Sequence, residues 1–219
     1  MSGADTDHNL FPVFFNLKGR RCVIAGGGLV AQRKAGQLLE CGARVSIVSP
    51  SVTQQIKAWH AEGQLTWCRH AWTREYIAGA FMVFAATSSS RTNRSIAATC
   101  RQQGISVTVA DNPELCDFIV PAVLRRKALA VAISTRGNSP MLARKIRTEL
   151  EQILTDAHGE FVDILGGLRR RLRRSVPDAR RRRKIFETIV DSDILALLKA
   201  GKRNEAEKQV RQCILSSQD

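Results

Sequence analysis

The chain has 219 residues, 44% of them apolar and 25% charged, which are ordinary values for a folded globular protein and exclude a disordered or fibrous chain. Basic residues outnumber acidic ones by 34 to 20, and the net charge of +14 favours an anionic partner such as nucleic acid, anionic lipid or a multiply charged small molecule. No apolar run reaches the roughly 18–20 residues that a membrane helix needs.

The first 110 residues alternate between strand-like and helix-like patterns. Strands are predicted at 21–25, 44–48, 65–68, 80–86 and 105–110, and helices at 31–41, 53–62 and 91–103. Gly42 and Gly104 stand where two of these helices should stop. Strand–helix alternation of this kind indicates a doubly wound parallel sheet, so we expect an α/β fold with an N-terminal Rossmann-type domain at 1–113.

The pattern changes after Pro113. Two β-like runs, 118–124 and 129–135, predict a hairpin. A strong helix pattern follows at 141–154, with Ser139 as its N-cap and Pro140 in its first turn. The rest of the chain to residue 217 is predicted to be helical, with breaks at Pro177 and Gly201. We therefore expect a small α+β region at 114–147 and a C-terminal helical domain at 148–219.

The N-terminus and the cysteines favour a cytoplasmic protein. Residues 1–9 are polar and lack the basic and apolar regions of a secretory signal. No two of the six cysteines are separated by only two residues, so neither a zinc ribbon nor a thioredoxin-like motif is present. We predict reduced thiols, a cytoplasmic location and no contact with a membrane.

A glycine loop follows the first predicted strand and opens a helix. Its sequence Gly26-Gly27-Gly28-Leu29-Val30-Ala31 matches G-x-G-x-x-A. In this motif the first glycine allows a tight turn, the second lets the backbone approach a pyrophosphate, and the small residue lets the helix sit close to the sheet. The helix N-terminus then faces the phosphates. We predict a dinucleotide site at Gly26 and Gly28; the alternative is a glycine-rich turn without a ligand.

The end of the second strand does not identify the dinucleotide. An acidic residue that binds the ribose hydroxyls is expected there, and the sequence has Val48-Ser49-Pro50-Ser51 instead. Ser49 or Ser51 could bond a hydroxyl without charge selectivity, so NAD and NADP stay open. Arg44 stands at the wrong end of the strand for a 2′-phosphate, which slightly favours NAD.

Two further candidates follow later strands. Thr87 and Ser88 come after the 80–86 strand, where ligands of open α/β sheets bind, so we predict contact with the nicotinamide half; the alternative is that Ser88 or Ser90 only caps a helix. Asp111 follows the 105–110 strand and is the only acid between residues 76 and 113. A carboxylate there could accept a proton as a substrate is oxidised; the alternative is an Asp that starts a turn.

The chain resembles the precorrin-2 dehydrogenases, which include the N-terminal part of siroheme synthase and the fungal dehydrogenase/ferrochelatase. The similar segments occur in the same order at 10–17, 26–34, 85–87, 109–111, 118–122, 133–140 and 142–144. The resemblance covers nearly the whole chain and is firmest over 11–150. It implies NAD as cofactor and oxidation of precorrin-2 to sirohydrochlorin in siroheme biosynthesis; in some members the same cleft then inserts Fe²⁺.

The resemblance also implies roles for single residues. Leu29 and Val30 would contact the pyrophosphate through their backbone, Pro50 and Ser51 the adenosine end, and Asp111 would be the catalytic aspartate. It implies a homodimer joined through about 114–147, with the C-terminal helices covering the cleft.

Precorrin-2 carries eight carboxylates, so its site should be rich in arginine and lysine, and Arg136, Arg144 and Lys145 are the candidates for binding it. The basic stretch 166–184 holds ten basic residues and one acid, and its simplest interpretation is a solvated helix face. A nucleic-acid binder would need aromatic residues among these arginines, and none lies between Phe161 and Phe186, so no nucleic-acid partner is expected.

No protein metal site is expected. The four histidines do not pair at metal-ligand spacing, and a tetrapyrrole supplies its own four nitrogens to an inserted metal. Two alternatives to the dehydrogenase stay open: a non-catalytic NAD-sensing regulatory module, which gives no role to the basic tail, and a nucleic-acid binder, which leaves the glycine loop unexplained.

Overall fold

The computed structural model describes residues 10–216; the predicted lack of a signal segment at 1–9 concerns residues outside that range. The chain divides into two compact units, Met1–Val120 and Pro121–Asp219. The predicted boundary after residue 113 lies shortly before this division. Within the described residues, no helix is both long and apolar enough to cross a membrane.

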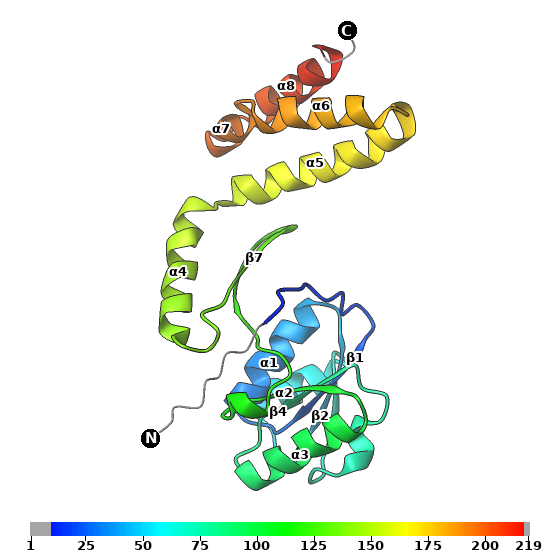
Figure 1. Ribbon diagram of the computed structural model, residues 1–219, viewed down its shortest axis with the longest axis vertical. Coiled ribbons are helices and arrows are strands. Elements are labelled where there is room, and N and C mark those ends of the chain that lie inside the picture. Colours follow the sequence, from blue (N-terminus) through cyan, green and yellow to red (C-terminus); the bar gives the residue numbers. More distant parts are fainter. Residues whose placement is uncertain (1–9, 217–219) are drawn as a thin grey trace. The chain divides into compact units, whose positions relative to one another are not determined.

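The first unit is built on a parallel sheet of five strands (Figure 1). The strands are β1 (Arg21–Ala25), β2 (Arg44–Val48), β3 (Thr66–Cys68), β4 (Met82–Ala85) and β5 (Ser106–Val109), in the order β3-β2-β1-β4-β5. Its helices are α1 (Leu29–Glu40), α2 (Gln54–Ala61) and α3 (Ser90–Gln102), with short 3₁₀ turns at Arg74–Ile77 and Pro113–Leu115. This is the doubly wound arrangement that the sequence predicts.

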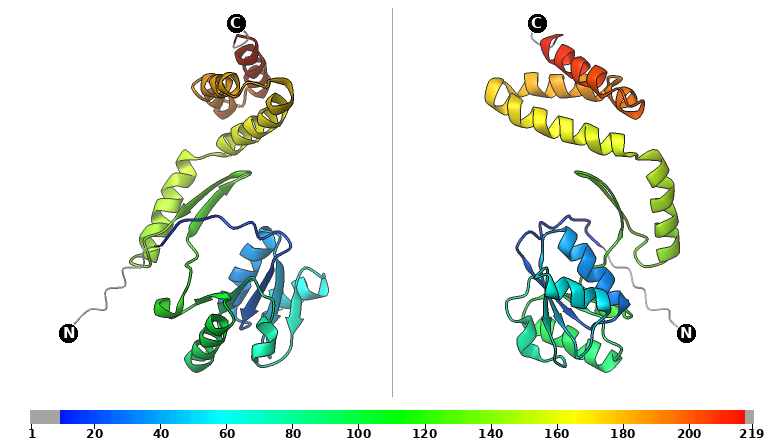
Figure 2. Two further views of the ribbon diagram at one scale, coloured as in Figure 1. Left: turned by 45° about the vertical axis from the view of Figure 1, so that its right-hand side comes forward. Right: turned by 180° about the vertical axis from the view of Figure 1, so that it is seen from behind.

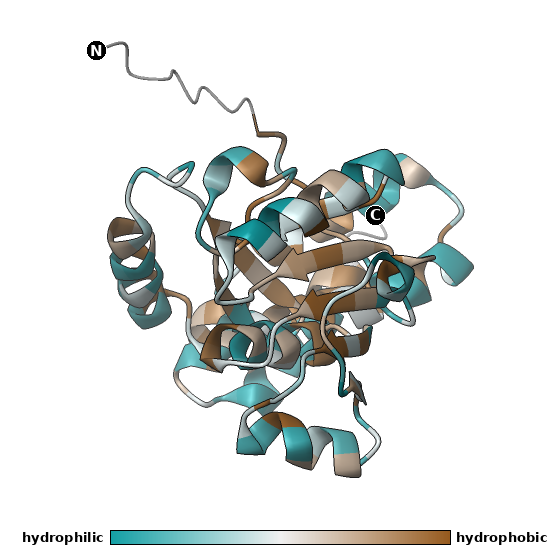
Figure 3. Ribbon diagram, turned by 90° about the horizontal axis from the view of Figure 1, so that it is seen from below, coloured by the Kyte–Doolittle hydropathy of each residue, from teal (hydrophilic) through white to brown (hydrophobic). Residues whose placement is uncertain are grey.

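Each face of the sheet has its own core, because successive side chains of a strand point to opposite faces. Cys22 and Ile24 of β1 pack with α1 and α2 on one face. Val23 and Ala25 pack with α3 on the other. Figure 3 shows the central strands as apolar ribbons between helices of mixed polarity. Burial on both faces explains why these strands are apolar throughout.

The helix stops are confirmed at two glycines. Gly42 after α1 has φ of 71°, and Gly104 after α3 has φ of 65°, in the left-handed region that glycine enters without steric cost. Helix α1 begins at Leu29, two residues before the predicted start, so the glycine loop leads directly into the helix.

The second unit combines a hairpin with five helices (Figure 2). Strands β6 (Ala122–Arg126) and β7 (Leu129–Ile133) pair antiparallel. The helices are α4 (Pro140–Ile153), α5 (Asp156–Ser175), α6 (Ala179–Val190), α7 (Ile194–Lys199) and α8 (Arg203–Ser216). Ser139 caps α4 as predicted, because its side chain accepts a hydrogen bond from Leu142 N–H. Helices α5 to α8 share one apolar core.

The predicted strand at 118–124 is wrong in its first half. Phe118 packs edge-on against Phe84 of β4, with ring centroids 5.6 Å apart, and so belongs to the core of the first unit. Pro121 has no N–H with which to extend a ladder, and β6 begins after it. Phe118 therefore belongs to a different core from the hairpin.

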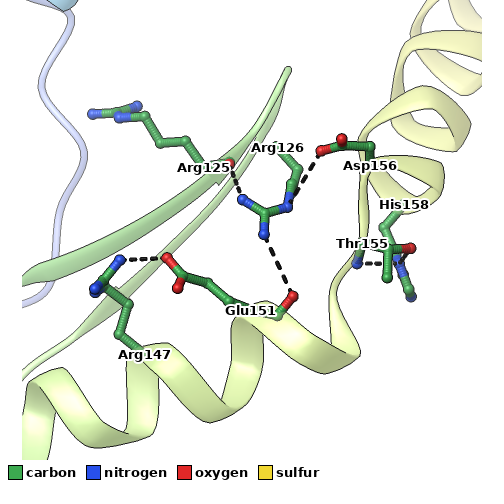
Figure 4. A network of polar contacts seen from close by, with 7 residues as sticks. All are labelled: Arg125, Arg126, Arg147, Glu151, Thr155, Asp156 and His158. Atoms are coloured by element: carbon green, nitrogen blue, oxygen red, sulfur yellow. Dashed lines mark hydrogen bonds and ion pairs between the residues drawn. The ribbon is translucent and has the colours of Figure 1, made fainter.

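Arg126 ties the hairpin to two helices (Figure 4). Its Nη2 donates to the Glu151 carbonyl at the end of α4 (3.4 Å), and its Nε forms an ion pair with the Asp156 carboxylate of α5 (3.4 Å). Glu151 in turn pairs with Arg147 within α4. These contacts stabilise a two-stranded sheet that would be only marginally stable on its own.

Candidate dinucleotide site

The site lies at the carboxyl ends of the parallel strands. β1 stands between β2 and β4, so the chain leaves the sheet in opposite directions from β1 and β4. Ligands of such sheets bind at this switch point. The predicted site residues of the first unit, Gly26, Gly28, Leu29, Val30, Pro50, Ser51, Thr87, Ser88 and Asp111, all lie just beyond strands β1, β2, β4 and β5.

Two glycines of the loop are required by close backbone neighbours. Gly26 has φ of 119°, and a Cβ there would collide with the Ala86 carbonyl. A Cβ on Gly27 would meet the Ser51 carbonyl and come within 2.8 Å of the Ser49 hydroxyl. Gly28 differs, because a Cβ there would have no atom within 4 Å. The space in front of Gly28 is what a pyrophosphate needs.

The N-terminus of α1 is not capped by the protein. Gly28 is the N-cap and offers no side-chain hydrogen bond, and the first turn contains no acidic residue. Ala31 is fully buried, so the helix lies close to the sheet, whereas Leu29 is 76% exposed. Free N–H groups and the positive end of the helix dipole suit an anion. The loop and helix therefore fit a dinucleotide phosphate.

The structure at the end of β2 argues against Ser49 as a ribose contact. Ser49 is buried, and its hydroxyl donates to the Ser51 carbonyl (2.7 Å), so it holds the turn. Pro50 and Ser51 are exposed. Arg44 lies at the opposite end of the strand, where its Nε donates to the Gly19 carbonyl (2.8 Å). Arg69, for which the sequence predicted no role, follows β3 at the carboxyl edge with its guanidinium over the Trp67 ring (5.8 Å).

A buried amide links the two remaining candidates. The side chain of Asn93, on α3, is 1% exposed. Its Oδ1 accepts hydrogen bonds from the Thr87 N–H (3.2 Å) and hydroxyl (2.7 Å). Its Nδ2 donates to the Thr87 carbonyl (3.2 Å) and to Asp111 Oδ1 (3.3 Å). Asn93 thus fixes the β4 exit and the Asp111 carboxylate relative to each other.

Asn93 is absent from the residues predicted from the sequence, although a signal is present. It lies on the α3 face that carries the buried Ile96, Ala97 and Cys100. A buried asparagine needs hydrogen-bond partners, so a polar residue on that face is informative. The alternative that Ser88 or Ser90 caps the helix is wrong, because Ser89 accepts the hydrogen bond from Thr92 N–H. Ser88 is exposed at the edge of the site.

The predicted substrate-binding residues all belong to the second unit. Arg136 is in the loop between β7 and α4, with φ of 53°. Arg144 and Lys145 are exposed on the first turns of α4, and Lys145 Nζ lies 4.0 Å from Glu149 Oε1. They belong to a different unit from Asp111. Among residues 10–216, no group of three or more His, Cys, Asp or Glu side chains could hold a metal ion.

Three family models match consecutive parts of the chain. The model described as "Putative NAD(P)-binding" matches residues 13–122, half of the chain. "Sirohaem biosynthesis protein central" matches 126–153, and "Sirohaem synthase dimerisation region" matches 157–214. The chain belongs to the NAD(P)-binding family of sirohaem biosynthesis proteins. A nicotinamide dinucleotide is therefore its cofactor class. The model named for dimerisation matches 157–214, whereas the sequence analysis expects the dimer contact at 114–147. The contact at 114–147 stays a prediction.

Individual proteins show the same relationship. The siroheme synthase of Nitrosococcus oceani is 34% identical over 196 residues, which are 90% of this chain and 42% of that protein. Siroheme synthase 1 of Pectobacterium atrosepticum is 34% identical over 211 residues, 96% of this chain and 44% of that protein. The chain thus spans less than half the length of these relatives. The solved structure of SirC, a precorrin-2 dehydrogenase, matches with a TM-score of 0.76 and 26% identity, over 93% of this chain and 100% of SirC.

Proposed function

We propose that this chain catalyses the NAD-dependent oxidation of precorrin-2 to sirohydrochlorin in siroheme biosynthesis. The observation that carries the proposal is the Asp111 carboxylate held by buried Asn93 at the sheet edge where the glycine loop lies. The full-length match to SirC, whose name states this dehydrogenase activity, supports it.

The residues at the carboxyl ends of the parallel strands around the dinucleotide site, called the crevice below, suit a two-electron oxidation. The bound nicotinamide supplies a hydride acceptor. A substrate that loses a hydride in becoming sirohydrochlorin also loses a proton, and Asp111 is the base that takes it. Asn93 Nδ2 donates to Oδ1 of Asp111 only, and Asp111 is exposed. The Oδ2 atom of Asp111 is therefore available to the substrate.

The binding groups divide by the part of the ligand that they meet. The backbone of Gly26, Gly28, Leu29 and Val30 binds the pyrophosphate, Pro50 and Ser51 contact the adenosine end, and Thr87 and Ser88 border the nicotinamide. NAD is favoured over NADP because Arg44 lies at the far end of β2, away from a 2′-phosphate. Arg136, Arg144 and Lys145 bind the carboxylates of precorrin-2 and sirohydrochlorin.

The deciding experiment mixes the full chain with NAD⁺ and precorrin-2 under anaerobic conditions and follows the absorption spectrum. We expect sirohydrochlorin and NADH to form together. In Asp111→Ala, turnover should fall by roughly 10²–10⁴-fold because the base is lost, with NAD affinity retained. Glu62→Ala, a change at an exposed acid to which no role in the site or the dimer is assigned, is the control and should retain activity.

Two results would refute this assignment. Full conversion by Asp111→Ala would remove the aspartate from its role. Tight NAD binding without any conversion would favour a non-catalytic NAD-sensing module. Adding Fe²⁺ to the sirohydrochlorin formed tests the second activity that the resemblance implies, since siroheme should then appear.

We also propose a homodimer joined through 114–147. Met141 of α4 is 81% exposed in this region, and Val190 of α6, in the segment 157–214, is 52% exposed. If the contact is at 114–147, Met141→Asp should shift the mass measured by ultracentrifugation from dimer to monomer, and Val190→Asp should not. The opposite result would place the interface in the C-terminal helices.

A further inference from the structure

A cavity of about 240 Å³ lies on the helical part of the second unit, and its lining consists of Arg169, Arg173, Arg182 and Phe186. Arg169 and Arg173 are one turn apart on α5, and Arg182 and Phe186 are one turn apart on α6. Residues four apart share a helix face, so each helix directs two groups to the cavity. Three arginines of the basic stretch 166–184 thus converge.

The helices hold these arginines on a packed base. Leu168 and Leu172 of α5 and Ile185 and Ile189 of α6 are buried in one core, and each cavity residue directly follows or closely precedes one of them. Arg182 is fixed further, because its Nη1 donates to the carbonyls of Val176 (2.7 Å) and Pro177 (2.6 Å). The cavity is therefore bordered by at least one oriented guanidinium.

The positive charges of the cavity lack acidic partners. Within residues 10–216, the side chains of Arg169 and Arg173 make no hydrogen bond and no ion pair, and no carboxylate lines the cavity. Other arginines of the unit behave differently: Arg183 pairs with Glu187 (2.7 Å) and Arg203 with Glu160 (3.0 Å). Like charges around one hollow repel each other, and an anion placed between them would remove that cost.

We propose that this cavity is an anion site, separate from the dinucleotide crevice, which takes a compact dianion carried on a small organic molecule. Guanidinium groups bind phosphate or paired carboxylates through two parallel hydrogen bonds, and Phe186 offers an aromatic face to the apolar part of the ligand. The volume lies below the roughly 300–1,000 Å³ of ordinary ligand pockets, so a phosphate or a pair of carboxylates fits better than a whole macrocycle.

Calorimetric titration of the full chain tests this site, with the crevice saturated with NAD⁺ and at about 150 mM salt. Phenyl phosphate probes the phosphate source and phthalate the paired-carboxylate source, and both are dianions with an apolar ring near neutral pH. We expect saturable binding of one of them, with one ion per chain. Arg169→Gln with Arg173→Gln should weaken it by at least roughly tenfold, because two charge-assisted hydrogen-bond donors are lost.

The matched control is Arg170→Gln with Arg174→Gln, which removes the same charge from the same helix outside the cavity lining. Its affinity should change less than roughly threefold, by screened long-range attraction alone. Equal losses of anion affinity in both double variants would mean that the anion is held only by the overall positive charge, and would overturn the proposal. So would the absence of saturable binding, or binding that appears only when NAD⁺ is left out.

Discussion

The dinucleotide crevice and the arginine cavity both suit anions, but they do so by different means. The crevice offers the free N–H groups at the start of α1, and contacts between backbone, glycines and the buried Asn93 hold its parts, which come from the ends of neighbouring strands. The cavity uses the side chains of two helices, and among its described arginines Arg182 alone is held by hydrogen bonds to the backbone. Substitutions in a site made of backbone should therefore be costly, whereas a site made of exposed side chains can lose one side chain with only a partial loss of affinity.

The largest expected effect is at Gly26, where a side chain would disturb the backbone contacts of the crevice directly. Gly26→Ala should destabilise the protein by about 3 kcal/mol or more, because φ of 119° is strained for alanine and its Cβ would collide with the Ala86 carbonyl. Gly28→Ala should cost about 0.5 kcal/mol or less, since its Cβ meets no atom within 4 Å, while it weakens NAD binding. Urea unfolding and NAD titration measure both; equal stability losses would contradict the contact geometry.

The next effect is at Asn93, which extends the comparison from backbone to a buried side chain. Asn93→Ala leaves polar groups of Thr87 without partners, so unfolding free energy should fall by about 1–3 kcal/mol. Because Asp111 loses its orienting donor, turnover should drop by roughly 10–100-fold with NAD affinity little changed. Ser95→Ala, an exposed change on α3, is the control. Turnover that survives in Asn93→Ala would limit this residue to stability.

These two positions show what a sequence can predict about such a site. Gly26, Gly28 and Asp111 follow strand ends, so a local pattern along the chain makes them candidates, and the catalytic role predicted for Asp111 comes from the family resemblance. Gly27 and Asn93 matter because of partners from other elements, the Ser51 carbonyl and the Asp111 carboxylate. Their roles depend on which strands become neighbours, and local spacing does not contain that information.

The same limit explains the misplaced strand and the cavity. An apolar run predicts burial, but it does not say in which core: residues 118–121 look like the start of β6, yet Phe118 packs on Phe84. Likewise, ten basic residues in 166–184 predict a charged helix face. Only the pairing of α5 with α6 brings Arg169, Arg173 and Arg182 to one hollow.

A smaller, pH-dependent effect concerns a lysine of the first unit. Burial, and to a lesser degree the charge of Arg33, lowers the pKa of Lys34 on α1 from its usual 10.5 to about 8. Between these values the unfolded chain binds more protons than the folded one, so stability should rise with pH in that window. The gain is on the order of 1–3 kcal/mol.

Lys34→Met isolates this contribution. Burial raises the pKa of Cys22 to about 11 and of Cys100 to about 12, and these thiols oppose the rise above pH 9 because the unfolded chain then loses protons first. The difference in unfolding free energy between Lys34→Met and the unchanged chain should therefore be read from about pH 8 to 10.5. A constant difference across that range would mean that Lys34 is not desolvated.

The smallest expected effect is at Arg69, an exposed charge beside the crevice and so the counterpart there of the cavity arginines. Its guanidinium lies over the Trp67 ring (5.8 Å), a contact of about 0.5–1 kcal/mol at an exposed site, which competes with binding a 2′-phosphate. Arg69→Gln should change the KM for NADP by less than roughly fivefold and leave that for NAD unchanged. A loss of tenfold or more for NADP alone would show that an exposed side chain sets cofactor choice even in a site otherwise made of backbone.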